Sequence, residues 1–128
     1  MSSGNLITTN GRIIAQDRLW NAVPTYSEPS TFEVGTGTTT PLVTDTDLQT
    51  SVYGPKVFAS GYPVLDETTL NTTVRCLLLT TEANGNSLTE FGIKNTDGTP
   101  MLFSHAVHTA ITKSAAVQVI YIEKDKIT

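Results

Sequence analysis

The stretch TLNTTVRCLLL, residues 69–79, decides the fold class. On an extended chain its side chains alternate between two faces, so that Val74 and Cys76 share one face and Arg75 lies on the other. A period of two residues is typical of a β-strand that buries one face. The last part of the stretch is apolar on both faces, which an isolated two-layer sheet protein would leave partly uncovered.

Similar short alternating segments lie on both sides of this stretch, with turn residues between them. Asn84-Gly85 and Asp97-Gly98 are typical of hairpin turns because both pairs tolerate positive φ angles. Threonine makes up roughly one residue in six, and its β-branched side chain favours strands. We therefore predict an all-β fold, an antiparallel β-sandwich. The other predicted strands cover residues 31–35, 52–61, 88–95, 101–111 and 116–123.

The N-terminal part of the chain predicts the one full helix, and residues 43–48 predict a turn that leads into a single helical turn capped by Thr44 or Asp45. Good helix formers follow Thr9 and Asn10, either of which can cap a helix over about 9–20. Residues 1–8 are small and polar, and we expect them to form an extended arm. The length of the chain, 128 residues, is that of one domain.

Composition excludes two classes of partner. The net charge is −4 and no cluster of lysine and arginine is present, so we predict no nucleic-acid binding. The longest apolar run, residues 76–79, is far too short to span a membrane, and residues 1–5 do not resemble a signal peptide. A single cysteine, Cys76, cannot form an intrachain disulfide, and we predict a buried, unreactive thiol.

Candidate chemical motifs are few. Gly35-Thr36-Gly37 lacks the lysine and the third glycine of a nucleotide-binding loop, and is interpreted as a flexible loop. His105 and His108 have a spacing that would suit zinc on a helix, but on a strand they point to opposite faces. The sequence therefore predicts no enzyme, no catalytic residue, no cofactor and no metal.

Two predicted strands have more apolar residues than one buried face needs, and this apolar surplus is the stronger functional signal. Segments 74–79 and 117–122 are apolar on both faces for part of their length. Three arrangements are open: the N-terminal helix folds back over the extra face, another subunit covers it, or both. The residues predicted to form such an interface are Leu77, Leu79, Val117, Val119, Ile120, Ile122 and Trp20.

Six segments lie in order along most of the chain: ITTNG (7–11), FEVGTGTTTP (32–41), TDTDL (44–48), LTEFGI (88–93), GTPMLFS (98–104) and ITKS (111–114). Together they resemble structural proteins of tailed-phage virions. This family occurs in tail-fibre, baseplate and small capsid-associated proteins. The resemblance implies a β-rich component of the phage particle and carries no catalytic residues to this chain.

The resemblance and the apolar surplus together give three hypotheses. The first is a capsid decoration (cement) subunit in the virion, associated with itself, as a trimer, and with the major capsid protein. The second is a tail, baseplate or fibre-base component that contacts the host surface through exposed Tyr26, Tyr53 and Tyr62. The third is a small enzyme or ligand-binding sandwich that uses His105 or His108. The number of copies per particle distinguishes the first two, because a capsid subunit is present in hundreds.

Overall fold

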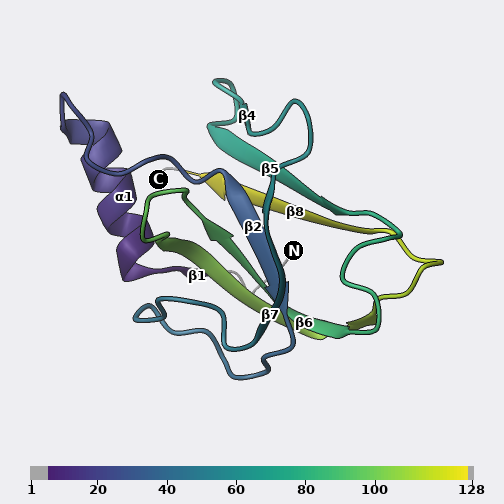
Figure 1. Ribbon diagram of the computed structural model, residues 1–128. Coiled ribbons are helices and arrows are strands. Elements are labelled where there is room, and N and C mark those ends of the chain that lie inside the picture. Colours follow the sequence, from purple (N-terminus) through teal and green to yellow (C-terminus); the bar gives the residue numbers. More distant parts are fainter. Residues whose placement is uncertain (1–5, 127–128) are drawn as a thin grey trace.

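The computed structural model describes residues 6–126, which form two antiparallel sheets and one short helix (Figure 1). The first sheet has the strand order β1-β7-β6-β2-β3, and the second has the order β4-β5-β8. The predicted all-β sandwich is therefore confirmed. The strands are β1 (Leu6–Ile7), β2 (Thr31–Gly35), β3 (Ser51–Val57), β4 (Val64–Leu65), β5 (Asn71–Leu78), β6 (Ser87–Lys94), β7 (Leu102–Thr112) and β8 (Val119–Lys126).

The helix α1 (Thr9–Trp20) has the predicted bounds. Its cap is Thr8, one residue before the expected Thr9 or Asn10, and the Thr8 hydroxyl accepts a hydrogen bond from the Gly11 N–H at 2.9 Å. The helix packs against β7, which lies next to the edge strand β1 in the five-stranded sheet. It therefore belongs to the first sheet and does not fold over the second.

The described part of the predicted N-terminal arm, residues 6–8, belongs to the body of the protein. Leu6 and Ile7 pair with Ser104 and His105 of β7, so they are part of the sheet. The Thr8 N–H donates to the Phe103 carbonyl, and its side chain is fully buried. Residues 1–5 lie outside the described part of the chain.

The core lies between the two sheets. Phe91 of β6 stacks on Tyr121 of β8 with ring centroids 4.4 Å apart, and this pair joins the layers. Cys76 and Leu78 of β5 are completely buried in the same cluster. The alternation predicted for β5 is thus confirmed, and burial raises the pKa of the Cys76 thiol, with a smaller contribution from the nearby Glu123.

Of the two hairpin turns predicted between strands, the structure confirms one and contradicts the other. The turn around Asp97-Gly98 joins β6 and β7 as an antiparallel pair, as predicted. The turn around Asn84-Gly85 does not make a hairpin, because β5 and β6 belong to different sheets and the connection crosses between layers. Pro55 lies in β3, an edge strand, which fits the missing N–H of proline.

The segment between β2 and β3 covers the other face of the five-stranded sheet. Phe91 and Ile93 face the core, so by alternation Glu90 and Gly92 face away from it. A Cβ atom built on Gly92 would lie 2.4 Å from Leu48, a buried residue of that segment. The single helical turn that we expected over 43–48 is absent there, and the chain forms a bend and turns instead.

Candidate functional site

The outer face of the three-stranded sheet carries a cluster of aliphatic side chains. β5 and β8 pair through eight consecutive residues without a bulge, and this register places Leu77 opposite Ile120. Ile120 and Ile122 are 42% and 47% exposed, whereas Tyr121 between them is buried in the core. Because neighbouring residues of a strand point to opposite faces, these three aliphatic side chains share the outer face. We call Leu77, Ile120 and Ile122 the outer apolar face.

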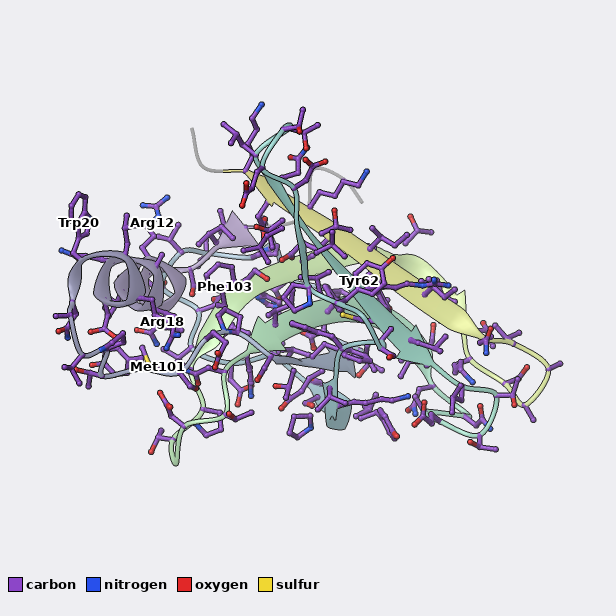
Figure 2. All side chains as sticks on the ribbon, turned by 90° about the horizontal axis from the view of Figure 1, so that it is seen from above. Arg12, Arg18, Trp20, Tyr62, Met101 and Phe103 are labelled. Carbon is purple, nitrogen blue, oxygen red and sulfur yellow. The ribbon has the colours of Figure 1, made fainter. Side chains whose placement is uncertain are left out.

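Four residues of the predicted interface lie elsewhere. Val119 is 6% exposed and belongs to the core, and Val117 is partly buried against that core, so both predictions are wrong. Both point inward because they lie two and four residues before Tyr121, and alternate residues of an extended chain share one face. Leu79 is 41% exposed but follows the last residue of β5. Trp20 is 80% exposed at the end of α1, and Figure 2 shows it standing out from the helix.

The outer apolar face has no cover within residues 6–126. The helix contacts β7 of the other sheet, and Ile120 and Ile122 remain nearly half exposed. The flanking positions are polar, since Arg75 pairs with Ile122 and Thr73 with Lys124. Of the three explanations for the apolar surplus, the two in which the helix folds over this face are therefore contradicted. The subunit interface stays a prediction.

A second cluster, which the sequence analysis missed, is polar and buried. Glu90 of β6 is completely buried, and its carboxylate accepts hydrogen bonds from the N–H groups of Gly37, Gln49 and Thr50 at 2.8–2.9 Å. Burial by itself raises the pKa of Glu90, but these bonds and one from His105 lower it below its usual value. The carboxylate thus stays ionised and fixes the connection between β2 and β3.

This cluster explains the glycines of the Gly-Thr-Gly motif. A Cβ atom on Gly35 would lie 2.5 Å from a carboxylate oxygen of Glu90, and one on Gly37 would lie 2.6 Å from the same oxygen. A side chain at either position would push the backbone away from Glu90. The motif thus contributes one donor, the Gly37 N–H, to the carboxylate of Glu90, and its two glycines leave room for that carboxylate.

His105 of β7 links two carboxylates. Its Nδ1 lies 2.8 Å from Asp45 Oδ2, and its Nε2 lies 2.8 Å from Glu90 Oε1, while the ring is completely buried. A ring nitrogen that carries a proton donates it to the carboxylate oxygen that it faces, because ionised carboxylates only accept hydrogen bonds. The carboxylate of Asp45 also accepts from the Leu42 N–H at 2.9 Å. We call Asp45, Glu90 and His105 the buried polar cluster.

The remaining candidates for chemistry are separated in space. Ser104 directs its hydroxyl to Glu123 at 3.0 Å, on the face of β7 opposite to His105. His108 contacts the Tyr121 hydroxyl through Nε2 at 2.8 Å. Among residues 6–126, no serine is brought to a histidine in a hydrolytic arrangement. The same part of the chain holds no group of three or more histidine, cysteine or acidic residues suited to a metal.

The tyrosines considered for host contact are less exposed than expected. Tyr53 donates its hydroxyl to Glu82 at 2.7 Å and packs, like Tyr62, against the core. Tyr26 is also partly buried. The three tyrosines are therefore only partly exposed, and two of them, Tyr53 and Tyr62, pack against the core.

Comparisons of the chain with protein-family models, with curated proteins and with solved structures found no match. None of the described residues form a helix of the length and apolar character needed to cross a membrane. The geometry of the two clusters is thus the basis for a functional proposal, beside the resemblance in the sequence.

Proposed function

We propose that this chain is a structural subunit of a tailed-phage particle, a capsid decoration protein that acts through surface contacts. The observation that carries the proposal is the outer apolar face. Burying one aliphatic side chain completely is worth about 1.5–3 kcal/mol, so leaving Ile120 and Ile122 nearly half exposed beside the partly buried Leu77 is unfavourable unless a partner covers them.

The sheet beneath this face suits a docking role. The β5–β8 pair is regular over eight residues, and its inner side is anchored by completely buried Cys76 and Leu78. A rigid platform loses little conformational entropy when it binds, which favours affinity. The resemblance to virion proteins supplies the context, and the expected partners are the major capsid protein and further copies of this chain.

Binding to particles tests the proposal. The purified protein is mixed with empty capsids and, separately, with isolated tails of the phage that encodes it, and each mixture is sedimented. We expect co-sedimentation with capsids at hundreds of copies per particle, measured by mass spectrometry, and greater resistance of the capsid to heat. Binding to tails at a few copies would support the tail or baseplate alternative. Binding to neither would contradict the proposal.

A matched pair of variants connects the binding to the outer apolar face. Ile120→Thr with Ile122→Thr removes the apolar surface and keeps β-branched side chains. Leu65→Thr makes a similar change at a 70% exposed position of β4, at the other edge of the same sheet. The double variant should bind capsids at least roughly tenfold more weakly, which corresponds to about 1.4 kcal/mol. The Leu65 variant should bind like the original protein.

A further inference from the structure

β8 has an edge to which no other strand within residues 6–126 is paired. The strand order β4-β5-β8 places it last in its sheet, with β5 on one side only. Its eight residues are paired to β5 in continuous register. The backbone N–H and C=O groups along the opposite edge are thus arranged to receive another strand.

The other edges are less suited to such pairing. β3 contains Pro55 and irregular register against β2, both of which disfavour a further strand. β1 and β4 have two residues each. β7 extends past β1, but its pairing with β6 is irregular in that part, between Leu88 and Glu90. β8 is the long, regular edge without a proline.

The sequence of β8 is complementary to itself in the antiparallel direction. If two copies pair about a two-fold axis at Tyr121, Ile120 of one copy lies opposite Ile122 of the other. Residues 119–123 of the two β8 strands then pair with each other, Lys124 lies beside Gln118, which precedes the strand, and no two charges of equal sign face each other directly. In a parallel pair in register, Lys124 and each of the other charged residues would face its own copy, which is unfavourable.

We propose that two copies of this chain associate through antiparallel pairing of their β8 strands, with Ile120 opposite Ile122 across the two-fold axis. The pairing joins the two three-stranded sheets into one of six strands with the order β4-β5-β8-β8-β5-β4. The outer apolar faces of both copies, Leu77, Ile120 and Ile122, then form one continuous surface. The contact deepens the self-association included in the proposed function and rests on it, and it gives a dimer in place of the trimer that the resemblance implied.

Light scattering coupled to size-exclusion chromatography tests the contact on the complete chain. The original protein should elute with the mass of a dimer that dissociates on dilution. Ile122→Lys places two ammonium groups diagonally across the axis and should weaken dimerisation at least roughly tenfold. Leu65→Lys introduces the same charge at the opposite edge of the sheet and should leave the dimer intact. Circular dichroism and thermal unfolding establish that both variants are folded.

Disulfide trapping tests the register. Chains with Ile120→Cys and chains with Ile122→Cys are mixed under a mild oxidant, and each is also oxidised alone. Directly opposite residues have Cβ atoms about 4.5–5.5 Å apart, close to the separation in a disulfide, whereas diagonal neighbours are about 7–8 Å apart. The mixture should therefore give covalent dimers faster than either variant alone. Cys76 is completely buried and does not compete.

The outcomes separate this inference from the proposed function. A protein that stays monomeric at all concentrations overturns the inference and the self-association, while its binding to capsids still decides the virion role. A trimer, a dimer that Ile122→Lys leaves unchanged, or equal trapping in all three mixtures overturns the β8 pairing alone. Dimerisation lost in Ile122→Lys and kept in Leu65→Lys, with preferential trapping in the mixture, supports it.

Discussion

The two sheets differ in the residues on their outward faces and in what covers them. The five-stranded sheet places Glu90 and His105 on its outward face, and the segment between β2 and β3 covers them and satisfies their hydrogen bonds. The three-stranded sheet places Leu77, Ile120 and Ile122 on its outward face, where Leu77 is partly buried and the two isoleucines stay nearly half exposed. Polar groups can be buried inside the chain because its own backbone supplies their partners, whereas the apolar face still lacks a cover.

The largest expected effect tests whether the buried polar cluster is structural. Glu90→Gln replaces an acceptor of four hydrogen bonds with an amide whose N–H groups face other donors, and removes the charge that pairs with His105. We expect a loss of about 3–5 kcal/mol in the free energy of unfolding in urea. Glu67→Gln, at an exposed position, is the control. Equal stability of the two variants would show that the cluster contributes little.

Leu77 and Leu78 are neighbours in β5 and point to opposite faces, so alanine variants at the two positions compare those faces. Leu78→Ala creates a cavity in the core and should cost about 2–5 kcal/mol in the free energy of unfolding. Leu77→Ala removes a side chain of similar size from the outer apolar face and should cost clearly less. Urea unfolding of both variants measures the difference. A larger loss for Leu77 would mean that its face is packed in the isolated chain.

The pH dependence of stability tests the pKa shifts of the carboxyl groups. Burial raises the pKa of Glu82, but hydrogen bonds from Lys56, the Leu79 N–H and Tyr53 lower it to about 2. A carboxyl group with a lowered pKa stabilises the fold above its unfolded pKa of about 4.3, and this contribution is lost as the pH falls through the folded value. Glu90 acts in the same direction.

Unfolding followed in urea from neutral pH down to about pH 2 should therefore show falling stability below about pH 4.3. Glu82→Gln should make that slope shallower. Asp125 acts in the opposite direction, because burial raises its pKa, so the stability that it contributes at low pH is lost as the pH rises through its folded value. An unchanged slope in the Glu82 variant would contradict the account of the Lys56–Glu82 pair.

The smallest effect on stability is expected on the outer apolar face. Ile120→Thr and Ile122→Thr change side chains that are already nearly half exposed, so each should alter the free energy of unfolding by less than about 1 kcal/mol. Thermal unfolding of the isolated chain measures this. A much larger loss would indicate that the face is structural in the monomer, which would weaken both proposals.

The six longer strands could be predicted from the sequence with shifts of a few residues at their ends, because alternation and turn residues act locally. β5 illustrates this, since its buried residues are the ones that the alternation in the sequence predicts. The two-residue strands β1 and β4 were not predicted. The partners of the strands could not be predicted in the same way. The turn around Asn84-Gly85 has the composition of a hairpin, but β5 and β6 alternate similarly, and either sheet could accept them.

The candidate sites show the same division. The sequence identified Leu77, Ile120 and Ile122 as surplus apolar residues, and their parity places them on the outer face. It did not identify Asp45, Glu90 and His105 as one cluster, because they come from a loop and two strands that are far apart in the chain. Two features of the sequence could have indicated the cluster. Glu90 is a charged residue inside a mostly apolar strand, and Gly35 and Gly37 lie in a loop whose role the sequence does not explain.

By itself the sequence determined the all-β class, the helix over residues 9–20, the burial of Cys76 and the apolar surplus of β5 and β8. These properties follow from local geometry, in which a side chain's face is set by its position along the strand. Only the tertiary structure decided which sheet each strand joined, which face the helix covered and which carboxylate the Gly37 N–H donates to. Those outcomes depend on contacts between distant segments, and many pairings of similar strands satisfy the same local pattern.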